Sequence, residues 1–207
     1  MHLIYHPQRD IYLANTIKVH HDRFGEKNED PYIWNERFLH SYCHITQMKS
    51  KVGDMNFWVS GDNLNSFTSL LCDCVFVVDE KSGWNNSNHL SPHDKIVEDQ
   101  LTFDHHYQWG GKQHYFKKRK RYTLKADPIK SFQPQFADGT LIDVVPYFLG
   151  VGISLDELRL GLKAGFQSKP MKLDPEVAQG LYEFLIKSAV IKLFGKELKA
   201  LRSGLSI

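Results

Sequence analysis

The feature that most constrains the fold is the run LLCDCVFVV at residues 70–78. It is almost continuously apolar and rich in β-branched and aromatic residues, which is typical of a strand buried on both faces of a sheet. We therefore predict a central strand here. A second strand is predicted over residues 55–60, between turn signals at residues 52–54 and 61–63.

The period of the apolar residues changes in the C-terminal part. Ser154 and Glu157 form a capping-box pattern, which predicts a helix to about residue 164. Asp174 and Pro175 predict the start of a second helix. Apolar residues then recur at a spacing near 3.6 as far as Leu201, which predicts one long helix that packs on the β core or on a second subunit. We expect a domain at residues 1–150 and a helical extension at residues 151–207.

Composition sets limits on the class of protein. The chain has 207 residues, of which 42% are hydrophobic, and this content suits a full core. A net charge of +2 excludes a generally basic protein, so only local patches can attract nucleic acid. The three cysteines do not suggest a disulfide framework, and no signal peptide or transmembrane run is recognised. We expect a cytoplasmic protein with no membrane partner and no cofactor.

Five consecutive cations lie between aromatic residues in the sequence HYFKKRKRYTLK at residues 114–125. Cationic side chains neutralise phosphates and aromatic rings stack on bases, so the segment predicts a surface for DNA or RNA. A solvated strand or loop and a nuclear-import signal are the alternatives. The predicted contact residues are Lys117, Lys118, Arg119, Lys120, Arg121 and Tyr115.

Three tryptophans are candidates for a base pocket. Trp58 lies at the end of a predicted strand, and Trp84 and Trp109 lie in loops rich in Gly or Asn. They either cover the core or form the stacking walls of a pocket for a planar base. Three further side chains are candidates for hydrogen bonds to the base edge: Ser60, Asp62 and His114.

Two other functions stay open. Asp104, His105 and His106 resemble the core triplet of a class of metal-dependent phosphoesterases, without the upstream His and Asp pair of those enzymes. With His20 or His21, the triplet suggests a metal-dependent hydrolase or a nucleotide-modifying enzyme. The third hypothesis is an interaction protein that forms a homodimer through its C-terminal helix.

Part of the chain resembles a known superfamily. The carrying segments are MKSKVGD at residues 48–54, the strand that ends at Ser60, the run at 70–78 and SFQPQ at 131–135. Together they resemble the PUA-like superfamily, which includes EVE, YTH, ASCH and nucleotide-modification-associated domains, over roughly residues 40–145. The resemblance implies an α+β fold, with a small mixed β-barrel, flanking helices and an additional C-terminal helical pair. It also implies that RNA or a modified DNA base is recognised at Trp58 and Ser60, beside the basic strand.

Overall fold

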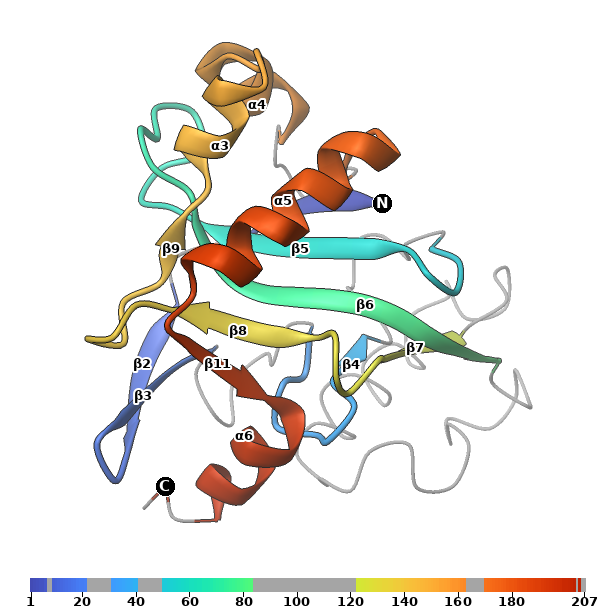
Figure 1. The fold of residues 1–207 in the computed structure, drawn as a ribbon, viewed down its shortest axis with the longest axis vertical. Coiled ribbons are helices and arrows are strands. Elements are labelled where there is room, and N and C mark those ends of the chain that lie inside the picture. The colour runs from blue at the N-terminus through green and yellow to red at the C-terminus, as the bar shows by residue number, and fades with distance from the viewer. Residues whose placement is uncertain are drawn as a thin grey trace, which may run out of the picture.

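The computed structural model describes residues 1–6, 9–21, 31–40, 50–83, 122–162, 170–203 and 205. Within this part the fold is mixed α+β, with a large and mostly antiparallel sheet of nine strands and four helices (Figure 1). A separate hairpin of two strands lies beside the sheet. The strands of the large sheet are β1 (His2–His6), β4 (Leu39–His40), β5 (Met55–Ser60), β6 (Leu71–Gly83), β7 (Tyr122–Ala126), β8 (Phe132–Gln135), β9 (Ile142–Asp143), β10 (Met171–Lys172) and β11 (Ile191–Phe194).

The centre of the sheet is β6, which confirms the central strand predicted from the apolar run. β5 runs antiparallel along one edge of β6, and β1 lies parallel to β5. Three strands pair with β6 in succession on its other side, namely β9, β8 and β7. The path ends at β10 and at β4, and these two strands do not pair with each other in the described part, so the expected small barrel is not confirmed.

Both faces of the sheet are covered, and each carries its own core. On one face Phe57 and Val75 pack with Leu181 and Leu185 of the helix α5 (Pro175–Ser188). Figure 1 shows α5 lying across β5 on this face. On the other face Trp58 packs in a second core with apolar residues of the 31–39 segment and of the C-terminal helix. All six residues of β5 are buried as a result.

The first part of the C-terminal region follows the sequence prediction. The helix α3 (Val145–Gly150) precedes α4 (Leu155–Gly161). Ser154 caps α4 as predicted, since its Oγ accepts a hydrogen bond from Glu157 N at 3.2 Å and Ser154 N donates to Glu157 Oε2 at 2.8 Å. The hydrogen bonds that Ser154 donates to the Glu157 carboxylate, from its backbone N and from its Oγ, lower the pKa of Glu157.

The prediction of one long C-terminal helix is wrong. Asp174 does precede α5, but that helix ends at Ser188, and the strand β11 and the helix α6 (Gly195–Arg202) follow. β11 pairs antiparallel with β8 from Ile191 to Phe194, so the open edge of a neighbouring strand overrides the helical period in this segment. A Cβ at residue 195 would lie 2.3 Å from the carbonyl oxygen of Glu36, so Gly195 allows α6 to approach the 31–39 segment.

The apolar face of α5 packs on the chain's own sheet. Leu181 and Leu185 are fully buried in the first core. Of the two partners allowed by the sequence, the β core is therefore the one that this helix contacts. None of the described helices has the length and apolar character needed to cross a membrane.

Buried polar side chains hold the hairpin of β2 (Asp10–Ala14) and β3 (Ile17–His21) against the large sheet. Gln133 of β8 accepts from His20 N at 2.9 Å and donates to His20 O at 2.8 Å. The same amide donates to Asp73 O of β6 at 2.9 Å. Next to it Arg9 Nε lies 2.8 Å from Asp73 Oδ2, in an ion pair whose side chains are only 4% and 3% exposed.

Candidate nucleic-acid interface

The second half of β6 extends beyond the buried core and forms a ladder with β7. The pairing runs from Val78 opposite Ala126 to Gly83 opposite Tyr122, with an irregularity between Val78 and Glu80. β4 pairs with the other edge of β7, since Leu39 lies opposite Lys125. The burial pattern changes along β6, because residues 72–78 are all buried while Asp79 and Lys81 are exposed.

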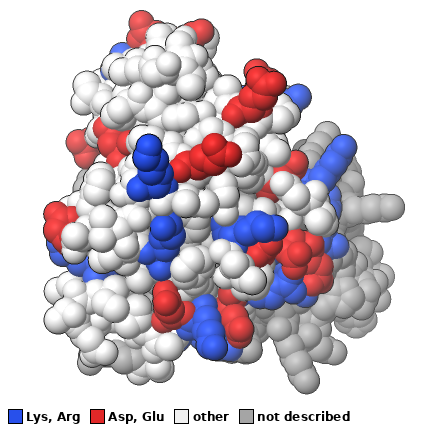
Figure 2. Space-filling model, in the orientation of Figure 1, with Lys and Arg blue, Asp and Glu red and all other residues white. Residues whose placement is uncertain are grey.

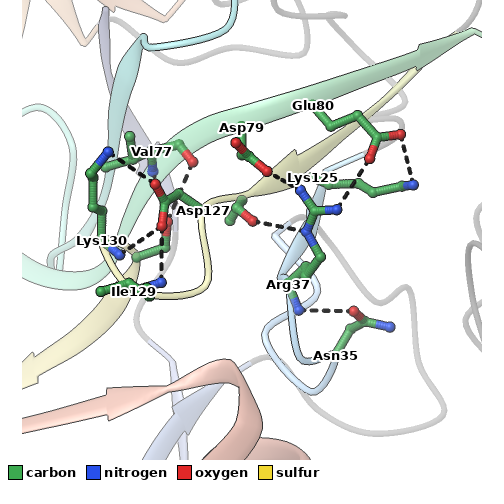
Figure 3. Close-up of polar contacts among 11 residues, drawn as sticks. Asn35, Arg37, Val77, Asp79, Glu80, Lys125, Asp127, Ile129 and Lys130 are labelled. Atoms are coloured by element: carbon green, nitrogen blue, oxygen red, sulfur yellow. Dashed lines mark hydrogen bonds and ion pairs between the residues drawn. The ribbon is translucent and has the colours of Figure 1, made fainter.

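Four charged side chains form a network on this ladder (Figure 3). Arg37 donates to Glu80 Oε2 at 3.1 Å from Nη1, and its Nη2 is paired with Asp79. Lys125 Nζ lies 2.8 Å from Glu80 Oε1. Arg37 Nε also donates to the carbonyl oxygen of Ala126 at 3.4 Å. The network therefore joins β6, β7 and the 31–39 segment, and each of its carboxylates has a cationic partner.

A tight turn fixes the other end of β7 to the buried half of β6. Asp127 Oδ1 accepts from Ile129 N at 3.0 Å and from Lys130 N at 3.1 Å, as Figure 3 shows. Burial raises the pKa of Asp127, but the hydrogen bonds from Ile129 and Lys130 outweigh this effect and the pKa is lowered. Asp127 N also donates to Val77 O at 2.7 Å. The turn thus holds β7 in place relative to the central strand.

The predicted basic run joins the sheet at the far end of this ladder. Tyr122, the first residue of β7, directly follows residues 117–121, and it is paired with Gly83, the last residue of β6. Trp84 and Arg121 are the covalent neighbours of this pair in the sequence. Nine residues of the predicted nucleic-acid site lie outside the described part: Trp84, Trp109, His114, Tyr115, Lys117, Lys118, Arg119, Lys120 and Arg121.

Charges of both signs are mixed over the rest of the visible surface. On the face drawn in Figure 2, Lys and Arg atoms alternate with Asp and Glu atoms, and the coloured residues form no large area of one sign. This mixture agrees with the net charge of +2 for the whole chain. On that face, described residues alone do not build a phosphate-binding surface.

The residues expected to form a base pocket on β5 are not assembled into one. Trp58 is 1% exposed and packs against Phe76, with ring centroids 5.6 Å apart. Its ring therefore has no open face on which a base could stack. Ser60 is also buried, with its Oγ 3.5 Å from Leu71 O, whereas Asp62 lies exposed in the turn after the strand. The reason is that β5 is covered on both faces, and the burial of Trp58 agrees with the alternative that this tryptophan covers the core.

A buried polar group on the same strand was not predicted from the sequence. Asn56 is fully buried, and its Oδ1 lies 3.0 Å from His2 Nδ1 and 3.3 Å from Ser50 Oγ. Its amide nitrogen has no hydrogen-bond partner in the described part of the chain. Burial is the main cause that lowers the pKa of His2, so this ring favours the neutral form. An Asn within an apolar strand was the available signal, because a buried amide has two donors to satisfy.

The described histidines of the metal hypothesis bind carbonyl groups instead. His20 Nε2 lies 2.9 Å from Gly139 O, and His21 Nε2 lies 3.3 Å from Pro31 O. In the part of the chain that the structure describes, no group of three or more His, Cys, Asp or Glu side chains could hold a metal ion. Asp104, His105 and His106 lie outside that part.

Comparisons of the chain with protein-family models, with curated proteins and with solved structures found no match. A functional proposal therefore rests on the sequence and on the geometry above.

Proposed function

We propose that the protein binds nucleic acid, and that the basic run at residues 117–121 contacts backbone phosphates at the open end of the β6–β7 ladder. The observation that carries this proposal is the pairing of Gly83 with Tyr122. It ties five consecutive cations directly to a strand that is itself fixed to the core. A phosphate-binding segment gains affinity from such an anchor, because less conformational freedom is lost on binding.

The ladder beside this junction supports the same role. Lys81 is exposed on β6, opposite Leu124 of β7, and adds a cation near the junction. Asp79 and Glu80 would repel phosphates if they had no cationic partners, but Arg37 and Lys125 pair with them. The local charge of the network formed by Arg37, Lys125, Asp79 and Glu80 is thereby balanced.

Base contacts belong to the same proposal. Trp84 is one peptide bond from the Gly83–Tyr122 pair, and Trp109, His114 and Tyr115 are the other aromatic candidates in the segment. An aromatic face on which a base stacks contributes about 1–3 kcal/mol per base. We further propose that the protein recognises a modified base, that it is related to the PUA-like superfamily and that it is cytoplasmic. The antiparallel pairing of β5 with β6 is compatible with the PUA-like resemblance.

The test is binding of labelled single- and double-stranded DNA and RNA by the full chain and by the double variant Lys118→Glu/Arg119→Glu. The variant removes two phosphate contacts and adds two repulsive charges, so we expect binding to weaken at least tenfold on every sequence tested. The matched control is Lys187→Glu/Lys196→Glu, which changes the net charge equally at exposed positions on α5 and α6. Equal losses in both variants would point to a general charge effect and would contradict the proposed site.

A further inference from the structure

Within the described residues, the hairpin has a strand edge with which no other strand pairs. β2 and β3 form a two-stranded sheet of their own, joined by the short turn at Asn15 and Thr16. Asn15 has a φ of 53°, the left-handed conformation that Asn tolerates in tight hairpin turns. Among the described strands β2 pairs only with β3.

The register shows which backbone groups of β2 face outward. Ala14 lies opposite Ile17 next to a two-residue loop, so this pair is hydrogen-bonded, and Tyr12 and Asp10 follow at every second position. The N–H and C=O groups of Ile11 and Leu13 therefore point away from β3, toward the open edge. These are the groups that an added strand would pair with.

The side chains of the same two residues are apolar and exposed. Ile11 is 57% exposed and Leu13 is 68% exposed, while Ala14 and the partly buried Tyr12 belong to the second core. Edge strands of natural proteins are commonly protected by charged residues or proline, and between residues 11 and 14 β2 has neither. In Figure 2 the lower left region, where Figure 1 places the hairpin, carries few coloured residues.

We propose that β2 pairs antiparallel with β2 of a second copy of this chain, so that the two hairpins form one four-stranded sheet. The sequence of β2 is self-complementary in the register centred on Tyr12. In that register Ile11 lies opposite the second copy's Leu13, as a hydrogen-bonded pair with two exposed apolar side chains in contact. Asp10 lies opposite the second copy's Ala14, so no like charges face each other. A twofold axis through Tyr12 repeats each contact, as a closed dimer requires.

The dimer is weak and concentration-dependent. Pairing of two five-residue strands buries less than the roughly 1,200–2,000 Å² of a standard stable interface. The monomer already buries its two cores, so it stays folded when the dimer dissociates. This proposal uses none of the residues of the nucleic-acid proposal and is independent of it.

The first test is the molecular mass of the full chain by sedimentation velocity, from low micromolar to submillimolar concentration. We expect a monomer–dimer equilibrium that Ile11→Lys/Leu13→Lys abolishes, with an unchanged melting temperature because both side chains are exposed. Ile129→Lys/Val190→Lys changes two other exposed apolar residues and should leave the equilibrium intact. A wild-type chain that stays monomeric throughout would overturn the proposal, as would a dimer that persists in the Ile11→Lys/Leu13→Lys variant.

The second test examines the register. Two of the three native cysteines, Cys72 and Cys74, are buried. With the third replaced by Cys43→Ser, Ile11→Cys protein mixed with Leu13→Cys protein should form a disulfide-linked dimer under mild oxidation. Each protein alone should cross-link poorly, because identical positions lie two residues out of register. Equal cross-linking in the mixture and in the separate samples would contradict the self-pairing of β2. Capture of an unrelated extended peptide by a chain that does not self-associate would also contradict it.

Discussion

The two halves of β6 contain the same kind of ion pair in opposite surroundings. In the first half, Asp73 pairs with Arg9 among buried residues. In the second half, Asp79 pairs with Arg37, and their side chains are 49% and 32% exposed. The strand β6 thus runs from the buried core to a ladder exposed to solvent. The carboxylate of Asp73 is paired away from water, whereas that of Asp79 is paired in contact with water.

The difference follows from solvation. A buried charge whose partner is removed is left uncompensated in a medium of low dielectric, whereas water takes over the role of a lost partner at the surface. The first half of β6 therefore determines the fold, and the second half can change without unfolding the protein. This tolerance suits a ladder that leads to the proposed binding segment.

The largest effect is expected for Asp73→Ala. Breaking the buried pair should lower the free energy of unfolding by about 3–5 kcal/mol, because the guanidinium of Arg9 stays buried after it loses the Asp73 carboxylate. Denaturant titration followed by circular dichroism measures this loss. Asp79→Ala is the matched control, also an Asp of β6 that pairs with Arg, and should lose less than about 1 kcal/mol. Similar losses of stability in the two variants would contradict the claim that the buried ion pair matters more for folding than the exposed one.

Between pH 7 and pH 5, a pH dependence of stability is expected from a histidine on the buried side. His20 lies in the network that holds the hairpin, and burial is the main cause that lowers its pKa below 6.5, with Lys18 adding to the shift. The hydrogen bond to Gly139 O and the charge of Asp73 act in the opposite direction. As the pH falls below 6.5, the unfolded chain binds a proton at this site before the folded chain does, so stability should decrease.

Thermal unfolding between pH 7 and pH 5 would measure this decrease. His20→Gln removes the titrating group, so its melting temperature should fall less over this range than that of the wild type. His2 has a pKa lowered in the same direction and is present in both proteins, so the difference isolates His20. Parallel curves for the two proteins would show that His20 does not contribute.

The smallest effect is expected for Glu80→Gln on the exposed half. The variant weakens the ion pairs of Glu80 with Arg37 and Lys125, which are worth about 0.2–1 kcal/mol each at a surface. Denaturant titration at low and at high salt should show a small loss that shrinks as salt screens the charges. A loss comparable to that of Asp73→Ala would show that the ladder is part of the folding core.

The sequence predicted those features of the fold that local patterns determine. The apolar run gave the central strand, and the Ser154 and Glu157 spacing gave the start of α4. It failed where distant segments meet. The helical period of 3.6 continues through residues 191–194, yet these residues form a strand because they pair with β8. A pattern within the segment could not predict this, since β8 lies more than 50 residues earlier in the sequence.

The candidate site was predictable only in part, for the same reason. The run of cations can be recognised in the sequence. The pairing of Gly83 with Tyr122, which follows this run, is a contact between residues separated by 38 others and could not be predicted from a local pattern. Trp58 was selected because an aromatic residue near a turn resembles a stacking wall. Its burial comes from the hairpin, the 31–39 segment and α6, and no local pattern reports such cover.

The most direct test of the nucleic-acid proposal is the salt dependence of the binding constant of the wild-type chain for a DNA duplex. If all five cations contact phosphates, the logarithm of the constant should fall with the logarithm of the salt concentration with a slope of about −4.5. Lys118→Glu/Arg119→Glu should make the slope shallower by about two units, since each lost phosphate contact removes about one. No binding at low salt, or binding whose strength does not depend on salt, would contradict the proposal.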